Sequence, residues 1–184
     1  MQSVDILVEE HRWIGKLVES LSKLVAIFDA GGGLDARAGQ ELLDLLASFA
    51  DGSHQDKEER CLFPRLRTLA SWEEAELLKR LAEEHTRDRL RFATLRGQLL
   101  SLLKKDETAK RNFVRDAEAY AQMQREHMSA ENRVLFPMAE RILTLQDDHD
   151  LLEEFDRLDH TGPGAARRLR ERIEALCERL GVPF

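Results

Sequence analysis

HQDKEERCLFP, at residues 54–64, returns in altered form as HMSAENRVLFP at residues 127–137. Each copy has a His, a Glu four residues later and Leu-Phe-Pro at the same offsets. Each is preceded by a lone His that follows two Glu: His11 comes 43 residues before the first copy and His85 comes 42 residues before the second. The chain thus repeats the pattern of one His and then His-x-x-x-Glu, which we interpret as a metal site built from two similar halves.

The spacing inside each copy suits metal binding from a helix. Residues four apart lie on one face of a helix, about one turn from each other, so the His and the Glu can point at one ion. The histidines fall on the apolar seams of predicted helices, where unpaired ionised groups would be costly to bury. Bound cations remove that cost. The predicted metal ligands are His11, His54, Glu58, His85, His127 and Glu131.

Six ligands without a thiolate are too many for one structural zinc ion, which usually takes four. Two first-row ions that share the two carboxylates fit better, with iron favoured and manganese or zinc as alternatives. The halves assign one pair of His to each ion, His11 with His54 and His85 with His127, and an oxo or hydroxo group would complete the bridge. A bundle in which metal serves structure alone, as zinc, is a competing interpretation.

Apolar residues recur every three or four positions through four long stretches, which indicates helices that each have one buried seam. The predicted helices cover residues 5–28, 35–69, 72–102 and 108–145, with shorter ones at 147–158 and 165–180. Pro64 and the equivalent Pro137 should kink or loosen their helices. In the fourth helix the expected inward stripe includes Tyr120, Gln124 and Val134.

This pattern predicts an all-α four-helix bundle with extra short C-terminal helices. We expect a single domain over residues 1–184, with a core bundle at about 5–145 and a C-terminal helical extension at about 146–184. A chain of 184 residues, 42% hydrophobic and 34% charged, is long enough to bury a proper core.

Charge and cysteine content limit the classes of partner. The net charge of −7, without a basic stripe, argues against nucleic acid. Apolar runs are too short to span a membrane, and the N-terminus does not resemble a signal peptide. Cys61 and Cys177 have no paired spacing that would suggest a disulfide. We therefore expect a cytoplasmic protein with no membrane partner, present as a monomer or a weak homodimer.

This set of residues resembles the hemerythrin-like family, the HHE cation-binding domains. The resemblance rests on the two repeated copies with their Leu-Phe-Pro, on LVEEHRWI around His11 and on LAEEH ending at His85, and it covers roughly residues 5–145. It implies an up-down four-helix bundle that holds a non-haem di-iron centre. It also implies that the six residues named above are the ligands.

One position departs from the oxygen carriers of that family. They have a second His one turn beyond the third-helix His, where this chain has Arg89 next to Asp88. One iron would lack a third imidazole, which favours the chemistry of the family's bacterial members: sensors of oxygen or nitric oxide, peroxide-reactive proteins and proteins linked to the repair of iron centres. We expect Arg89 to pair with Glu84 or Asp88, or to donate to a metal-bound ligand, and Asp88 is a candidate extra ligand.

The expected function is therefore that of a non-haem di-iron protein that binds or reacts with oxygen, nitric oxide or peroxide. The alternatives are iron storage or donation, iron-centre repair, and a di-iron oxidoreductase that consumes peroxide or nitric oxide. Metal binding or sensing is favoured over enzymatic turnover, and no catalytic residue is identified. Tyr120 and Cys61 are interpreted as core residues, and Glu10 and Glu84 as surface groups or as groups that orient the imidazoles.

Overall fold

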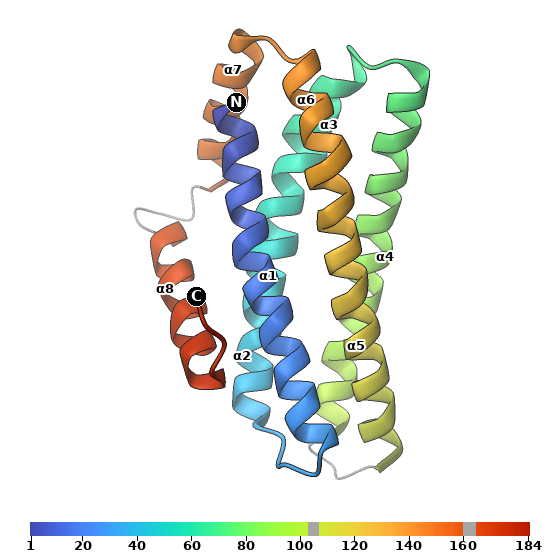
Figure 1. Cartoon of the computed structure of the whole chain (residues 1–184), viewed down its shortest axis with the longest axis vertical. Coiled ribbons are helices and arrows are strands. Elements are labelled where there is room, and N and C mark those ends of the chain that lie inside the picture. The colour runs from blue at the N-terminus through green and yellow to red at the C-terminus, as the bar shows by residue number, and fades with distance from the viewer. Residues whose placement is uncertain (103–106, 160–164) are drawn as a thin grey trace.

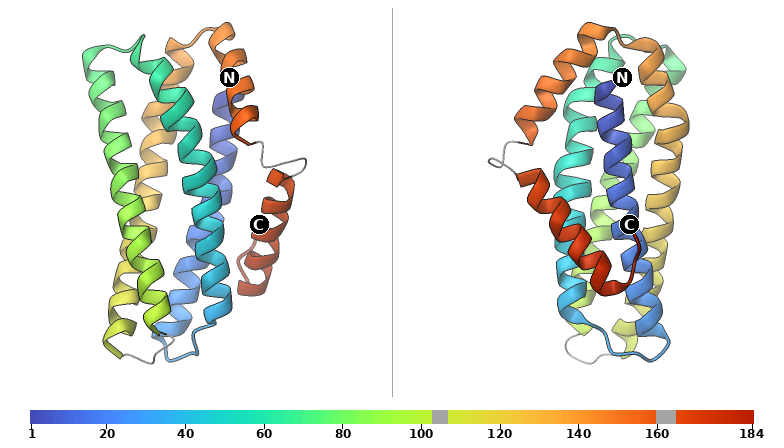
Figure 2. Two further views of the ribbon diagram at one scale, coloured as in Figure 1. Left: turned by 180° about the vertical axis from the view of Figure 1, so that it is seen from behind. Right: turned by 60° about the vertical axis from the view of Figure 1, so that its left-hand side comes forward.

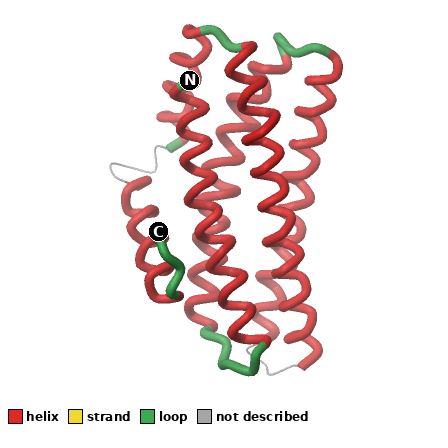
Figure 3. The backbone as a smooth tube through the Cα atoms, viewed as in Figure 1, coloured by secondary structure: helices red, strands yellow, loops and turns green. Residues whose placement is uncertain are grey.

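Long helical rods run alternately up and down the molecule, as Figures 1 and 2 show. The structure is a computed structural model that describes residues 1–102, 107–159 and 165–184. No strand occurs in these ranges (Figure 3). The predicted all-α bundle is confirmed. Most of the connections between the helices predicted at 72–102 and 108–145, and between those predicted at 147–158 and 165–180, lie outside the described residues.

Two of the four rods are uninterrupted α-helices and two change helix type along their length. The first rod is α1 (Gln2–Asp29) and the third is α4 (Trp72–Leu102). The second rod consists of α2 (Ala36–Leu46), the π-helical segments η1 (Ala47–Gln55) and η2 (Glu58–Leu62), and α3 (Phe63–Arg67). The fourth consists of α5 (Glu107–Ala130), the π-helical η3 (Glu131–Leu135) and α6 (Phe136–Ile142).

Local capping chemistry sets several of the rod ends. After α1, Gly31 has φ 89°, a left-handed conformation that glycine adopts without a steric penalty. The Asp35 side chain accepts a hydrogen bond from the Ala38 N–H at the start of α2. A capping box is present at the start of α4, with the Ser71 N–H donating to Glu74 at 2.7 Å.

The fourth rod ends at Ile142, three residues earlier than predicted. Leu143 adopts an extended conformation with ψ 146°. Thr144 then caps the next helix and forms a capping box with Asp147. The rod stops here because the capping box of Thr144 and Asp147 starts a new helix. The apolar pattern, which continues to Leu145, does not show this interruption.

The two prolines of the repeated copies produce wide π-helical turns. Pro64 and Pro137 are the second residues of α3 and α6, so each lies two positions after the last residue of a π-helical segment. A proline ring clashes with the carbonyl four residues earlier in a regular α-helix, and its nitrogen carries no hydrogen to donate. A wider turn relieves that clash, and π-turns are frequent at functional sites.

The π-turn in the fourth rod also corrects one sequence expectation. Val134, placed on the inward stripe by α-helical spacing, is 50% exposed, whereas the neighbouring Leu135 is fully buried. A π-turn contains one residue more than an α-turn, so the inward register moves forward by one position. The second copy thereby buries Leu135 and Phe136, the equivalents of the buried Leu62 and Phe63.

Two apolar clusters fill the bundle, and the predicted metal site lies between them. One cluster contains Leu7 with the Leu-Phe pairs of both copies, and the other begins at Ile14 on α1 and contains Phe92. His11 falls between Leu7 and Ile14 along α1. The predicted ligands therefore form a polar belt across the bundle, with one packed apolar cluster on each side of it.

Two further helices, α7 (Leu145–Leu158) and α8 (Ala165–Leu180), lie along the outside of the bundle (Figure 1). The first contacts α1 and η2, and the second contacts α1 and α2. These are the predicted C-terminal helices, and the assignment of the whole chain to one domain stays a prediction. Over the described ranges, no helix is both long enough and apolar enough to cross a membrane.

Asp148 on α7 caps the N-terminus of α1, and its removal should weaken the fold. It accepts hydrogen bonds from the N–H groups of Gln2 and Ser3 at 3.1 and 2.9 Å and from the Ser3 hydroxyl at 2.5 Å. Asp148→Ala should lower the free energy of unfolding by about 1–2 kcal/mol, measured by urea denaturation. The exposed Glu153→Gln on the same helix is the control and should change it by less than about 0.5 kcal/mol.

The same cap predicts the sign of a pH effect. Burial alone would raise the pKa of Asp148, but the hydrogen bonds from Ser3 and Gln2 lower it below its ordinary value of 3.8. The contribution of the cap is therefore complete above pH 3.8 and is lost as the pH falls through the lowered pKa. Asp148→Ala should lack this part of the acid-induced loss of stability. Equal stability of variant and parent above pH 5 would contradict the role of the cap.

Candidate metal centre

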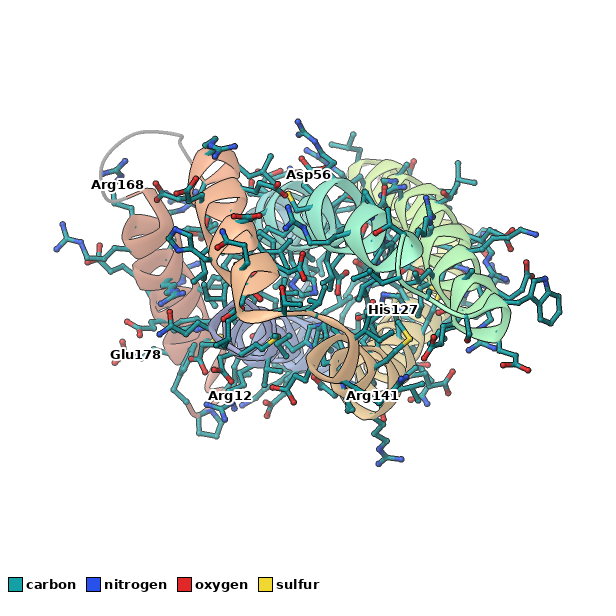
Figure 4. The ribbon with its side chains drawn as sticks, turned by 90° about the horizontal axis from the view of Figure 1, so that it is seen from above. Arg12, Asp56, His127, Arg141, Arg168 and Glu178 are labelled. Atoms are coloured by element: carbon teal, nitrogen blue, oxygen red, sulfur yellow. The ribbon has the colours of Figure 1, made fainter. Side chains whose placement is uncertain are left out.

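The six predicted ligands come from all four rods and meet inside the bundle. They form two groups, in each of which the candidate ligand atoms lie within 4.8 Å of one another: His11, His54, Glu58 and Glu131 in the first, and Glu58, His85, His127 and Glu131 in the second. All six side chains are buried. Figure 4 looks along the bundle and shows His127 among the helices, while Arg141 lies on the outside. Their role as ligands stays a prediction, but the structure brings every one of them together.

Glu58 divides its two oxygens between the groups. Its Oε1 lies 3.7 Å from Nε2 of His54, and its Oε2 lies 3.4 Å from Nε2 of His85. Because each oxygen faces the imidazole of a different group, this carboxylate is placed to bridge two ions.

Glu131 divides its oxygens in the same way. Its Oε2 lies 3.2 Å from Nε2 of His11, and its Oε1 lies 3.0 Å from Nε2 of His127 and 3.6 Å from that of His85. Each group therefore has two imidazole nitrogens and one oxygen from each shared carboxylate. The two groups coincide with the division that the repeat predicts.

The wide turns place these side chains. His54 lies in η1, and Glu58 and Glu131 are the first residues of η2 and η3. In the second rod, the inward seam steps by five residues from Phe49 to His54, where an α-helix would step by three or four. That step was the sequence signal for the π-helix, and it was missed.

Every imidazole of the site has an oxygen partner at its outer nitrogen. The Nδ1 atoms of His11, His54, His85 and His127 lie 3.0, 3.0, 2.8 and 3.0 Å from side-chain oxygens of Asn132, Glu10, Glu59 and Glu84, respectively. With Nδ1 donating to these oxygens, Nε2 of His11 and of His54 carries the lone pair and faces the centre. Nε2 of His85 and Nε2 of His127 also face the centre, where they lie 2.8 Å apart and share a hydrogen bond. Partners of this kind fix the tautomer and the ring orientation of metal-binding histidines.

These outer partners follow the repeat. Glu10 and Glu84 directly precede the two lone histidines, and each reaches the His of the next copy. Their predicted role in orienting imidazoles is confirmed in geometry, although Glu10 is buried and does not lie on the surface. Glu59 and Asn132 directly follow the two shared carboxylates and were not predicted. Their identical offset from the shared Glu was the available signal.

Buried polar atoms without hydrogen-bond partners surround the centre. Their number and chemistry show whether this donor set fits bound cations. Nε2 of His11 and of His54 and both carboxylate oxygens of Glu58 and of Glu131 are buried and make no hydrogen bond with any described residue. Each such atom costs about 1–3 kcal/mol when it is left without a partner. Six of them directed at one centre are what two cations would satisfy, so the donor set fits a binuclear metal site.

The charges of the two shared carboxylates are unequal in the metal-free protein. Burial, followed by repulsion from Glu131, raises the pKa of Glu58 well above its ordinary value. Burial also opposes ionisation of Glu131, but His127, His11 and His85 together lower the pKa of Glu131 well below its ordinary value. The metal-free centre therefore prefers one neutral and one ionised carboxyl, and two bound cations would allow both to ionise.

Burial keeps the His54 ring in the uncharged form at neutral pH. Burial, and then the nearby His11, lower the pKa of His54 to about 4. At neutral pH this ring is therefore uncharged, which is the form that binds metal.

Arg89 pairs with the second rod and not with the neighbours expected on its own helix. Its Nη1 donates to Glu59 at 2.9 Å and to Gln55 at 3.2 Å, and it lies 3.6 Å from Asp51. The expectation of Glu84 or Asp88 as its partner was wrong, because this long side chain reaches across to the second rod. Since Glu59 also accepts from His85, Arg89 supports the outer partner of that imidazole.

Asp88 lies outside both groups of candidate ligands. Its Oδ2 accepts a hydrogen bond from Gln124 at 3.0 Å, and Gln124 also donates to the Tyr120 hydroxyl at 3.2 Å. Burial raises the pKa of Asp88 to about 6, against the opposing effect of His127 and His85. Tyr120 is 3% exposed, and burial raises its pKa, which confirms its interpretation as a buried tyrosine with its hydroxyl bonded.

A groove of about 700 Å³ between α4 and α5 leads from the surface to the second group. His127, Glu84 and Asp88 line it together with Arg80 and Met123. A small molecule in this groove would therefore meet His127, its outer carboxylate Glu84 and the buried acid Asp88.

Lys57 is a further charged residue near the centre that sequence reasoning missed. It lies in the first copy, three residues after His54, yet only 1% of it is exposed, and it contacts Glu10. Nothing in the local sequence distinguishes it from a solvated lysine among charged neighbours.

Comparison with known proteins agrees with this geometry. A sequence model described as the hemerythrin HHE cation binding domain matches residues 2–139. Two proteins named as uncharacterized, one from Mycobacterium tuberculosis and one from Mycobacterium bovis, are each 22% identical over 178 residues, which is 96% of this chain and 69% of theirs. No solved structure gives a significant match.

Replacing Glu58 by the neutral, isosteric Gln should stabilise the metal-free protein. Because the pKa of Glu58 is raised, the metal-free fold loses stability as the pH rises from 4.5 through that raised pKa, and Glu58→Gln removes this loss. At pH 7 in the presence of a chelator, the variant should unfold at higher urea, with a gain on the order of 1 kcal/mol. Glu118→Gln, at an exposed position on α5, is the control and should have no measurable effect. A metal-free variant less stable than its parent would contradict the charge balance described here.

Proposed function

Since the chain belongs to the hemerythrin HHE cation-binding family, we propose that it is a non-haem di-iron protein that binds or reacts with oxygen, nitric oxide or peroxide. The observation that supports this most directly is the pair of His/Glu groups that share Glu58 and Glu131. A single-ion site would have no use for two carboxylates that each divide their oxygens between two groups.

The proposed ligands are the six residues of these groups, with two imidazoles and two carboxylate oxygens for each ion. Iron is favoured because the donors are nitrogen and hard oxygen without a thiolate, and manganese or zinc are the alternatives. Both cysteines are free and buried, and neither belongs to the groups. Free thiols also support a reducing, cytoplasmic setting.

The chain's own residues prepare the centre for a small ligand. The outer oxygens hold each imidazole with Nε2 inward, and the apolar layers above and below keep bulk water away. Four protein donors per ion leave coordination positions open, and the bound ions would supply the redox equivalents and the ligand-binding positions. Asp88 lines the groove and can accept and return a proton there, because burial raises its pKa to about 6, close to neutrality.

Arg89 favours reaction or sensing over reversible oxygen carriage. It stands where the family's oxygen carriers have an additional His, and its guanidinium is directed at Glu59 and away from the centre. The second ion would therefore keep a less saturated coordination sphere. The groove at His127 also supports iron donation, iron-centre repair or catalytic consumption of peroxide or nitric oxide as second candidates, since it would let metal or substrate reach that ion.

Metal analysis of the full chain tests the centre. After anaerobic reconstitution with ferrous iron, we expect two iron ions per chain, one for each group. His11→Ala and His85→Ala should each reduce the content to about one, because each removes an imidazole from one group, and Glu131→Ala should reduce it further because that carboxylate is shared. His149→Ala is the matched control, since this His is exposed on α7.

Two outcomes would contradict the proposal. The first is fewer than about one metal per chain in the parent protein. The second is an equal loss of metal in His149→Ala and His85→Ala, since His149 is remote from the groups.

Rapid mixing identifies the ligand. The reduced protein should react with at least one of oxygen, peroxide and nitric oxide, and we would follow it by its near-ultraviolet and visible absorption. A stable adduct without consumption of the ligand indicates sensing, continued consumption indicates an enzyme, and metal loss to an acceptor indicates iron handling. A centre that responds to none of the three and cannot be removed without unfolding would be structural.

A further inference from the structure

Lys57 links the first half of the metal centre to the C-terminal helices. Its Nζ lies 2.5 Å from Glu10 Oε1, 2.8 Å from Asp159 Oδ1 and 3.1 Å from the Ser53 hydroxyl. It also lies 5.9 Å from the centre of the Phe155 ring. The ammonium thus binds one carboxylate on α1 and one at the end of α7, and the Lys57 side chain is only 1% exposed.

This contact continues directly to a proposed ligand. Glu10 accepts from Nδ1 of His54 through its Oε2 while Lys57 binds its Oε1. Both oxygens of this carboxylate are therefore occupied, and the Glu10 side chain is only 5% exposed. A carboxylate fixed in this way holds His54 in one orientation, with Nε2 directed at the centre.

The second half of the centre has no buried cation at the equivalent position. Its outer carboxylate Glu59 binds Arg89 at 2.9 Å, but the Arg89 side chain is 38% exposed, whereas that of Lys57 is 1% exposed. The repeat places Ala130 where the first half has Lys57, three residues after the His of each copy. Glu84, the equivalent of Glu10, binds Nδ1 of His127 but has a side chain that is 29% exposed. The cation that pairs with Glu84 is Arg87, which is 3.9 Å away and 60% exposed, so the interaction is screened by solvent.

The second half of the centre is also the half that is more accessible to solvent. Glu84, Ala130 and His127 all line the groove between α4 and α5. Glu10 is covered by Lys57, which in turn contacts Asp159 and Phe155 of the C-terminal segment. A pocket of about 610 Å³ also lies beside Glu10, Ser53 and Asp159, but none of the proposed ligands lines it. The two halves therefore differ because a proposed ligand, His127, itself lines the groove of the second half.

We propose that Lys57 is a positioning residue that makes the His11–His54 metal position the more tightly held of the two, while the His85–His127 position exchanges its metal through the groove. This rests on the ligand set of the proposed function. It does not follow from family membership, because the family match ends at residue 139 and Asp159 lies beyond it. Replacing an outer partner of a metal-binding His typically changes metal affinity by about 10–100-fold, which sets the size of the expected difference.

Metal release measures the difference directly. The full chain is loaded with cobalt(II), which accepts the same nitrogen and oxygen donors as iron, and is then mixed with excess chelator. Release should occur in two phases of equal amplitude, one fast and one slow. His85→Ala should remove the fast phase and His11→Ala the slow phase.

Lys57→Met tests the contact between Lys57 and Glu10, since Met is unbranched and only one atom shorter than Lys and carries no charge. The slow phase should become about 10–100-fold faster, and the fast phase should not change. Lys57→Arg should restore slow release, because it returns a cation to Glu10. Unchanged phases in Lys57→Met would overturn the proposal, and so would equal acceleration of both phases, which would indicate a loosened fold. Urea unfolding of the metal-free variant shows whether it folds.

Ala130→Lys is the reciprocal variant and tests the proposal even when Lys57→Met does not fold. It adds a cation beside Glu84 at a groove-lining position, where there is space for it. The fast phase should become about 10-fold slower, with no change in the slow phase. An unchanged fast phase would count against the proposal. Lys79→Met, an exposed lysine on α4, is the control for charge alone and should leave both phases as they are.

This experiment separates the two levels of inference. A chain that binds fewer than two cobalt ions refutes the binuclear centre. A chain that binds two and releases them in a single phase, unaffected by Lys57→Met or Ala130→Lys, refutes the unequal positions and leaves the binuclear centre standing.

Discussion

The burial of two carboxylates at one point of a helical bundle is the constraint on which the rest of this structure depends. Glu58 and Glu131 are fully buried, and their oxygens make no hydrogen bonds with described residues. An apolar interior does not tolerate such groups without compensation. Four imidazoles around them, and the cations that this donor set fits, provide that compensation. The apolar layers on both sides of the belt then make the electrostatic interactions strong, because they exclude water.

The helices are adapted to this centre at the cost of regular geometry. A straight α-helix through Pro64 or Pro137 would clash with the preceding turn. The wide turns that relieve the clash begin at the shared carboxylates themselves, at Glu58 and Glu131. Each proline therefore sets the local geometry of the shared carboxylate and brings the Leu-Phe pair that precedes the proline into the apolar cluster around Leu7. Ligand placement and core packing are consequences of one local feature that occurs twice.

The repeat makes the inner part of the centre symmetric, and the surroundings break that symmetry. Both halves present the same donors to the centre, and both have an outer oxygen on each imidazole. Beyond that layer, the buried Lys57 binds Glu10 in one half, while in the other half a groove reaches His127 beside Glu84. Two ions held by the same donors would therefore differ in exchange and access, because the groups that control these properties belong to the outer layer and to the C-terminal helices.

The sequence by itself determined the helices, the bundle and the six inward side chains of the centre. It could do so because these features depend on local periodicity: an apolar seam every three or four residues, and a His and a Glu one turn apart. It misplaced Val134 because the inserted residue of a π-turn shifts the register without changing composition. It misassigned the partner of Arg89 and gave no sign of a role for Lys57. Only the tertiary structure decided those contacts, because they join residues on different rods, and the pairing of long charged side chains depends on how the helices pack and not on local spacing.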